Sequence, residues 1–168
     1  MVLRAPRDGD AEARLGLGSD PEIHRMFGGS RDRLAAMTRE RAERWADVLS
    51  RHPHAWVIER RTVIGEIRLD RVDLTDRRAS LAVGIVDPGA LGCGYGTEAV
   101  RLVLEHAFGG LGLHRVSARV LAFNARAIRC YEKCGFVIEG REREAALIDG
   151  EWHDDLIMGV LDREFGGG

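Results

Sequence analysis

A run of closely spaced glycines near the middle of the chain is the feature whose residue types most directly suggest chemistry. Glycine lets the backbone curl so that successive N–H groups point at one spot. A helix that follows adds its dipole and its free N–H groups. Together these groups would make an anion site suited to a pyrophosphate, although an ordinary turn fits the same spacing. The residues are Gly92, Cys93, Gly94, Tyr95, Gly96 and Thr97.

Two other phosphate-binding motifs fit this segment poorly. A dinucleotide-binding fingerprint has the order Gly-x-Gly-x-x-Gly near the start of a βαβ fold, with an acidic residue about 20 residues later. A P-loop contains Gly-Lys-Ser or Gly-Lys-Thr, whereas residues 92–97 contain no lysine. The pattern therefore favours neither of these motifs.

The glycine run lies between a predicted strand and a predicted helix. Pro21 after Asp20 marks a helix start, and residues 87–89, Asp-Pro-Gly, are a strong turn signal. Hydrophobic periodicity and the turn signals predict helices at 8–17, 20–27, 38–51, 97–108 and 125–134. They predict strands at 2–5, 55–59, 63–69, 79–86, 115–122, 136–139, 142–148 and 152–160. This order predicts a mixed α/β sheet with a strand–loop–helix–strand unit at its centre.

Length and composition fit one globular domain, predicted at residues 1–165 and followed by a disordered tail at 166–168. The chain has 168 residues, of which 45% are hydrophobic and 31% charged, and its formal net charge is −2. This charge argues against a broad cationic field for nucleic acid or anionic lipid. No apolar run reaches the roughly 18 residues of a membrane span. With three cysteines and no signal-peptide core, we expect a cytoplasmic monomer or homodimer without a metal site.

Three blocks in the second half of the chain carry a family resemblance. Residues 86–88 (Val-Asp-Pro), 91–99 (Leu-Gly-Cys-Gly-Tyr-Gly-Thr-Glu-Ala) and 124–136 resemble the GNAT superfamily of N-acetyltransferases. The last block, Asn-Ala-Arg-Ala-Ile-Arg-Cys-Tyr-Glu-Lys-Cys-Gly-Phe, is similar to that family's Asn-x-x-Ala-x-x-x-Tyr-Glu-x-x-Gly-Phe signature. Residues 139–141 and 149–155 resemble the branch named for ribosomal-protein N-terminal acetyltransferases. The resemblance is strong from Gly65 to Val160 and weak before that.

This resemblance implies a fold, a reaction and a cosubstrate. The fold would be the GNAT-type α/β fold, a central mixed, mostly antiparallel sheet of six or seven strands flanked by helices on both faces. The reaction would transfer an acetyl group from acetyl-CoA, without a metal, to a primary amine. The acceptor would be a protein N-terminus or a small-molecule amine. A non-catalytic acyl-CoA-binding module is the alternative that the sequence leaves open.

The resemblance also implies which backbone groups hold the cosubstrate. Gly84, Ile85 and Val86 would offer strand-edge groups to the pantetheine arm, which has two amides and can pair like an added strand. Residues 91–97 would bind the pyrophosphate. Leu91 stands where the family usually has Arg or Gln, so one side-chain contact near the phosphates is missing.

Two side chains of the last block, those of Asn124 and Tyr131, could have either a catalytic or binding role or a purely structural role. Asn124, the only asparagine, would bond to the cofactor arm or to a water, or would cap a helix. By resemblance, Tyr131 would be the general acid, since a phenol with a pKa of about 10 can protonate a thiolate whose thiol has a pKa of roughly 8–9. Alternatively, Tyr131 packs beside Ala127 and Ile128.

The general base is less well indicated. An amine nucleophile is mostly protonated near neutral pH and must lose a proton. Glu66 is the candidate, and His153 and Asp154 are two others. Family members often carry an acid at two positions that hold Ser80 and Arg119 here, and neither is a convincing base.

Overall fold

The computed structural model describes residues 1–166. Its strands are β1 (Val2–Arg4), β2 (Ala55–Glu59), β3 (Val63–Asp73), β4 (Arg78–Ile85), β5 (Arg115–Leu121), β6 (Val137–Ile148) and β7 (Glu151–Leu161). Its α-helices are α1 (Asp10–Leu17), α2 (Pro21–Met26), α3 (Arg39–Arg51), α4 (Tyr95–Glu105) and α5 (Ala125–Glu132). Shorter helical turns are η1 (Arg31–Arg33), η2 (Pro88–Ala90) and η3 (His106–Gly110).

Of the predicted tail, Gly166 lies in a turn, and residues 167–168 lie outside the described part. None of the helices within residues 1–166 is long and apolar enough to cross a bilayer.

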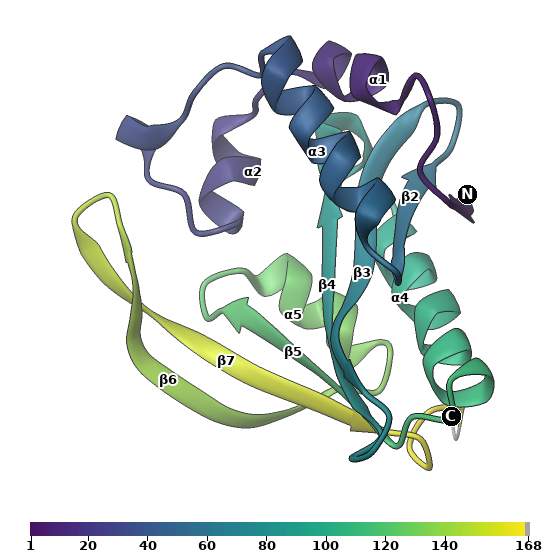
Figure 1. Ribbon diagram of the computed structural model, residues 1–168. Coiled ribbons are helices and arrows are strands. Elements are labelled where there is room, and N and C mark those ends of the chain that lie inside the picture. The colour runs from purple at the N-terminus through teal and green to yellow at the C-terminus, as the bar shows by residue number, and fades with distance from the viewer. Residues whose placement is uncertain (167–168) are drawn as a thin grey trace.

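The strands form one sheet in the order β1-β2-β3-β4-β5-β7-β6 (Figure 1). Neighbouring strands are antiparallel except for the parallel pair β4 and β5. The parallel pair needs a crossover, and α4 provides it, whereas short turns join the antiparallel pairs β2–β3, β3–β4 and β6–β7. The predicted mixed, mostly antiparallel sheet is therefore confirmed.

The two central strands pair at one end only. Residues 78–80 of β4 pair with residues 115–117 of β5, and no further pair joins these strands within the described residues. Figure 1 shows β4 and β5 diverging from this shared end. The second half of β4 consequently has an open edge on the side of β5.

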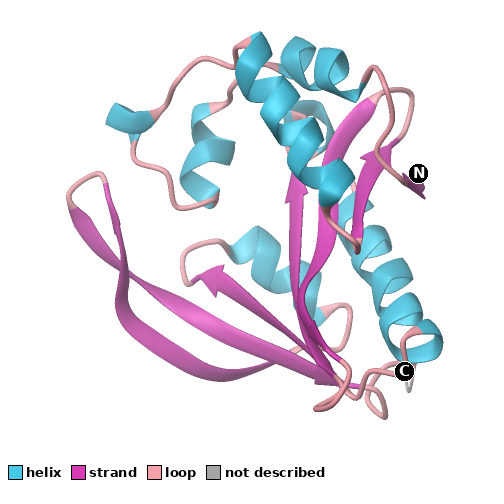
Figure 2. Cartoon of the chain, viewed as in Figure 1, coloured by secondary structure: helices cyan, strands magenta, loops and turns pink. Residues whose placement is uncertain are grey.

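Helices cover both faces of the sheet (Figure 2). The larger core packs Val100 and Leu104 of α4 against one face, which includes Ile58. The smaller core packs Leu49 of α3 against the other face, which includes Val57. Neighbouring residues of β2 thus belong to different cores, as the alternation of side chains along a strand requires. Burying each of these large apolar side chains stabilises the fold by about 1.5–3 kcal/mol.

Two helix starts follow from capping side chains. Asp20 accepts a hydrogen bond from the Ile23 backbone N–H at 2.8 Å, with Pro21 at the first helical position of α2. Thr38 accepts one from the Arg41 N–H at 3.3 Å at the start of α3. Both side chains satisfy a backbone donor that the helix itself leaves free, and both predicted starts are confirmed.

The prediction of separate strands at 136–139 and 142–148 is wrong, because β6 runs through both segments. The pairing of β6 with β7 shifts register between Ile138 and Gly140 and again between Glu142 and Ala146. Such β-bulges absorb extra residues without ending the ladder. Gly140 and Arg141, which lie between the two predicted segments, are therefore part of a continuous strand.

The tip of the β6–β7 hairpin is tied to the segment between α2 and α3. Asp149 and Gly150 have φ angles of 52° and 81°, as a two-residue hairpin turn of type I′ requires. The Arg31 N–H donates to Asp149 Oδ1 at 2.7 Å, and the Asp149 N–H donates to Ser30 Oγ at 3.0 Å. The N-terminal segment and the hairpin, which are far apart in sequence, are thereby joined.

Candidate active site

A cavity of about 260 Å³ lies at the open half of β4. Its wall combines the end of β4, the glycine run, the first turn of α4, one face of α5 and the end of α2. The predicted cosubstrate residues that line it are Ile85, Leu91, Gly92, Gly94, Tyr95, Gly96, Thr97 and Asn124. The predicted residues outside its lining are Gly84, Val86, Cys93 and Tyr131.

The glycine run has the backbone geometry of an anion site. Gly92 and Gly94 have φ angles of 74° and 85°, a left-handed region that strains residues with a side chain. Gly94 is the N-cap of α4. No N–H group of residues 92–97 donates to an acceptor within residues 1–166. These free donors and the positive end of the helix dipole meet at the cavity.

Two of the three predicted strand-edge residues turn their backbone groups away from the gap. The Val86 N–H donates to the Ile64 carbonyl of β3 at 2.9 Å. Because backbone polar groups alternate in direction along a strand, those of Gly84 also point to β3. A Cβ at Gly84 would lie 2.7 Å from the Phe27 ring, so the residue after α2 rests directly on this glycine.

Val83 and Ile85 provide the open edge instead. Ala79 is an odd-numbered residue of β4, as are Val83 and Ile85. Its carbonyl accepts a hydrogen bond from Ser117 Oγ of β5 at 3.3 Å. The odd-numbered residues of β4 therefore face β5, which has diverged by the level of Val83 and Ile85. Both residues line the cavity, where an extended ligand with amides can pair with them. The sequence did not indicate Val83, because which residues of β4 face β5 is determined only when the strands pair in the sheet.

Three cationic side chains of the cavity wall were also missed. Arg126, Arg129 and Lys133 line it from α5 and the residue that follows. Their spacing of three and four residues places them on one helix face, and this spacing was the signal available in the sequence. Arg126 also pairs with Glu22 of α2 at 2.8 Å. They supply positive charge beside the anion site, where Leu91 supplies none.

Asn124 has the structural role that the sequence allowed. Its Oδ1 accepts a hydrogen bond from the Ala127 N–H at 3.1 Å and caps α5. Its Nδ2 donates to the Met26 carbonyl at 3.4 Å, which joins α5 to α2. The helix-cap reading is confirmed. Because Asn124 also lines the cavity, contact with a cosubstrate stays a prediction.

Tyr131 lies mostly in the core. The residue is 4% exposed, and its ring centroid is 5.1 Å from that of Phe136. Burial raises the pKa of the Tyr131 hydroxyl above its ordinary value, so this group stays protonated at neutral pH. The fully buried polar atoms without a partner in residues 1–166 are His153 Nε2 and Asp155 Oδ1. The Tyr131 hydroxyl is not one of these fully buried atoms. Its role as the general acid stays a prediction.

The Cys130 thiol stands in the cavity wall beside the first turn of α4. Thr97 Oγ1 donates to Cys130 Sγ at 3.6 Å, and the Cys134 thiol donates to the Thr97 carbonyl at 3.5 Å. The neighbouring Cys134 thiol lowers the pKa of Cys130. All three cysteines are free thiols, and Cys93 is exposed on the loop.

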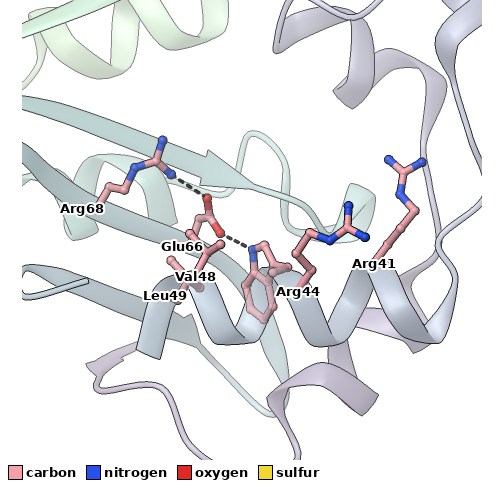
Figure 3. Close-up of a pocket in the computed structure, with 7 residues that line it drawn as sticks. Arg41, Arg44, Val48, Leu49, Glu66 and Arg68 are labelled. Carbon is pink, nitrogen blue, oxygen red and sulfur yellow. Dashed lines mark hydrogen bonds and ion pairs between the residues drawn. The ribbon is translucent and has the colours of Figure 1, made fainter. Parts of the chain in front are cut away.

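A second hollow, the α3–β3 groove, has a volume of about 560 Å³ and lies on the other face of the sheet (Figure 3). Glu66, the candidate base, lines it and stands opposite Gly84 in the register of β3 and β4. The groove therefore begins at the level of the open half of β4. The residues that line it are Arg41, Arg44, Trp45, Val48, Leu49, Glu66 and Arg68.

The Glu66 carboxylate is held by two donors. Trp45 Nε1 donates to Oε2, and Arg68 Nη1 donates to Oε1 at 3.0 Å. Burial raises the pKa of Glu66, and the nearby Arg68 and the Trp45 hydrogen bond oppose this only in part. A carboxylate with a raised pKa is a stronger base, which suits it to take a proton from an amine.

The other base candidates are less well placed. Asp154 accepts hydrogen bonds from the Glu144 N–H and Arg141 Nη1, both at 2.8 Å, and these donors lower its pKa. The His153 ring packs edge-on against Phe123 with centroids 4.8 Å apart, and its Nε2 is buried. Glu66 is thus the candidate that combines an accessible groove with a raised pKa.

Comparison with known proteins gives relatives of one kind. The probable N-acetyltransferase YjcK of Bacillus subtilis is 35% identical over 99 residues, 59% of this chain and 55% of that protein. The spermidine N(1)-acetyltransferase of Vibrio cholerae is 30% identical over 105 residues, 62% of this chain and 60% of that protein. The matches therefore span less than two thirds of these two relatives.

The solved structures give the same fold. A crystal structure of spermidine N-acetyltransferase from Vibrio cholerae in complex with CoA and spermine superposes with a TM-score of 0.78. It is 24% identical, and the match covers 97% of this chain and 96% of that one. The family model described as the acetyltransferase (GNAT) domain matches residues 1–137. Since this match covers most of the chain and the fold agrees, the protein belongs to the GNAT acetyltransferase family.

Proposed function

We propose that the protein transfers an acetyl group from acetyl-CoA to a primary amine, either a protein N-terminus or a small-molecule amine, by direct attack in a ternary complex. The observation that carries this proposal is the divergence of β4 from β5 beside the glycine run. That divergence frees backbone groups for an amide-containing arm at the place where N–H donors collect for phosphates.

Separate elements would bind the two ends of acetyl-CoA. The N–H groups of residues 92–97 and the cations of α5 suit its phosphates, which supply the negative charge. Val83 and Ile85 suit the pantetheine amides. This arrangement directs the thioester toward the C-terminal end of β4, where Gly84 and Glu66 stand opposite each other. The acceptor amine then approaches from the α3–β3 groove.

The proposed chemistry needs two proton transfers. Glu66 accepts the proton that the amine must lose, directly or through water. The amine nitrogen forms a bond to the acetyl carbon, and the carbon–sulfur bond breaks. Tyr131 donates the proton that the departing thiolate takes up, and solvent returns a proton to Tyr131.

A non-catalytic acyl-CoA-binding module is the second candidate. Its specific support is the position of Tyr131, which is 4% exposed and outside the cavity lining. Such a module would bind acetyl-CoA through the same glycine run and cations. Because it would catalyse no acetyl transfer, replacing Glu66 or Tyr131 would change no reaction rate.

The variant Tyr131→Phe separates the two candidates. It keeps the ring that packs on Phe136, so folding and acetyl-CoA binding should be unchanged. An enzyme should lose about 10²–10⁴-fold in turnover, because general acid catalysis contributes that much. Calorimetry gives the affinity and free-thiol detection gives the rate. Equal turnover by both proteins would contradict the role of Tyr131.

A thermal-shift comparison tests the cosubstrate class independently of turnover. Acetyl-CoA should raise the melting temperature of the wild-type protein through binding to the folded state. NAD and ATP should have smaller effects, because the glycine run fits neither of their binding motifs. Stabilisation by NAD or ATP alone would overturn the proposal.

A further inference from the structure

The α3–β3 groove carries more positive than negative charge. Three arginines and a single carboxylate line it, namely Arg41, Arg44, Arg68 and Glu66. In Figure 3, the guanidinium groups of Arg41 and Arg44 extend from α3 toward the open side of the groove, where that of Arg68 also lies. The apolar part of the wall is formed by Trp45, Val48 and Leu49.

The one carboxylate in the groove is already engaged by the protein. Glu66 accepts hydrogen bonds from Trp45 at one oxygen and from Arg68 at the other. Arg68 also pairs with Asp70 at 3.0 Å, so this arginine contacts both neighbouring carboxylates of β3. Among the residues that line the groove, arginines outnumber the one carboxylate, so a polycationic ligand would meet net positive charge there.

The arginines of α3 are available to a ligand. Arg44 pairs with Glu40 at 2.6 Å, but these side chains are 68% and 80% exposed, and exposed pairs of this kind contribute little. Arg14 of α1 adds a further cation close by. Burial lowers the pKa of Arg14, attraction to Glu66 partly opposes this, and repulsion from Arg41 adds to it.

The groove lies next to the proposed point of transfer. Glu66 pairs with Gly84, and Arg68 pairs with Ala82, across β3 and β4. Side chains of such directly opposed residues stand about 5 Å apart on the same face. An amine that reaches a thioester beside Gly84 would thus leave the rest of its molecule in the groove. Arg41 lies one helical turn, about 5.4 Å, from Trp45.

We propose that the acceptor is a primary amine that also carries a carboxylate or phosphate group, which Arg41 and Arg44 bind. This inference rests on the proposed acetyl transfer and narrows its acceptor. Trp45 bonds to Glu66, and Arg41 and Arg44 lie within one helical turn of Trp45 on α3, so the anion should lie roughly 5–10 Å from the nitrogen. The acceptor thus differs in charge from spermidine, for which several relatives are named, because a polyamine would place like charges together.

Matched acceptors of opposite end charge provide the test. δ-Aminovalerate and cadaverine share a five-carbon chain and a primary amine, but the far end is a carboxylate in one and an ammonium in the other. Aminobutylphosphonate represents the phosphate class. We expect kcat/KM to be about tenfold or more higher for an anionic amine than for cadaverine, since hydrogen bonds to charged groups have about that effect. Comparison of the two anionic amines shows whether carboxylate or phosphate is preferred.

The double variant Arg41→Ala/Arg44→Ala should remove this preference, mainly by raising KM for the anionic amine about tenfold, with kcat little changed. Arg41→Lys/Arg44→Lys should restore part of it. The matched control is Arg51→Ala on the same helix, because Arg51 pairs with Asp47 at 2.8 Å and does not line the groove. Cadaverine used as well as δ-aminovalerate, or a double variant that behaves like Arg51→Ala, would overturn the proposal.

Calorimetry on CoA-saturated protein separates this inference from the proposed function. Binding of an anionic amine that exceeds that of cadaverine and disappears in the double variant supports the groove, even if no amine is acetylated. In that case acetyl transfer alone would be contradicted. Binding of cadaverine that equals or exceeds that of both anionic amines overturns the groove assignment, whatever the turnover. Melting temperatures of the variants show that each is folded.

Discussion

At the scale of single residues, burial has different consequences for the two proposed proton-transfer groups. It raises the pKa of Glu66 and also that of Tyr131. For Glu66 the shift makes the carboxylate a better base, whereas for Tyr131 it makes the hydroxyl a weaker acid that is fully protonated at neutral pH. The two groups stand on different elements, β3 and α5, so each proton can be moved by its own group.

The pH dependence of turnover tests Glu66. Burial favours the neutral carboxylic acid, so the pKa lies above its ordinary value of 4.5. Below this raised pKa, Glu66 is protonated and cannot accept a proton. We expect kcat/KM to fall as the pH decreases through that value, and Glu66→Gln to lose about 10²–10⁴-fold in rate together with this acidic limb.

Asp70→Asn is the matched control for Glu66. Asp70 lies on the same strand and face and also binds Arg68, but it does not line the groove. Its acidic limb should resemble that of the wild type. An acidic limb that persists in Glu66→Gln would contradict the assignment of the base.

Cys130 reports on occupation of the cavity. Its thiol lines the wall, and its pKa is lowered by the neighbouring Cys134 thiol, which favours the reactive thiolate. We expect alkylation of Cys130 in the free protein and strong protection by acetyl-CoA. Peptide mass spectrometry distinguishes this site from the exposed Cys93. Equal alkylation of Cys130 with and without acetyl-CoA would contradict the position of the cosubstrate.

At the scale of elements, the start of α4 depends on a backbone conformation that glycine tolerates. Gly94 has a φ of 85°, and a side chain there should cost roughly 1–2 kcal/mol. Relief of this strain would turn the free N–H groups away from the cavity. We expect Gly94→Ala to weaken acetyl-CoA binding about tenfold, as measured by calorimetry.

Gly109→Ala is the matched control for Gly94→Ala. It replaces a glycine at the other end of the helical connection between β4 and β5. Gly109 has no neighbouring atom within 4 Å of an added Cβ and no positive φ. Its affinity for acetyl-CoA should equal that of the wild type. If Gly94→Ala binds equally well, the loop conformation is not what binds the phosphates.

The junction of β1 and α1 depends on a buried ion pair. Arg4 Nη2 lies 2.6 Å from Asp10 Oδ1, and Asp10 is 3% exposed. We expect Asp10→Asn to lower the free energy of unfolding by about 1–3 kcal/mol, seen as a melting temperature several degrees lower. Glu12→Gln breaks an exposed pair with Arg39 and should change stability by less than about 0.5 kcal/mol.

The same ion pair gives a pH dependence of stability. Burial by itself raises the pKa of Asp10, but Arg4 and the Arg7 N–H lower it more, so it lies below its ordinary value of 3.8. This stabilisation is present above the unfolded pKa and is lost as the pH falls through the folded pKa. The difference between wild type and Asp10→Asn should shrink over that range. A difference that stays constant with pH would contradict the ion-pair explanation.

At the scale of the whole molecule, local signals predicted most of the elements. Asp20 and Thr38 start helices as predicted, and Asp149 with Gly150 makes the turn between the last two predicted strands. These features depend on neighbours in sequence, so their residue types are sufficient to identify them. The glycine run was found for the same reason, since its residues are close neighbours in sequence, although its spacing alone also fits an ordinary turn.

Features that depend on distant contacts were missed or misread. Two strands were predicted at 136–139 and 142–148, but pairing with β7 carries β6 through Gly140 between them. Val83, rather than Gly84, faces the gap because of how β4 pairs with β3 and β5. The charge of the α3–β3 groove likewise arises only when α3 packs over β3. The sequence therefore indicated the donor site better than the acceptor site.

Incubation of the wild-type protein with acetyl-CoA and a panel of amines and peptides tests acetyl transfer most directly. Free thiol and the mass of each acceptor are measured together. We expect one thiol to be released for each acceptor that gains the mass of one acetyl group. Acetyl-CoA binding without acetylation of any acceptor in a broad panel, anionic and cationic amines included, would contradict the proposed enzyme and favour the binding module.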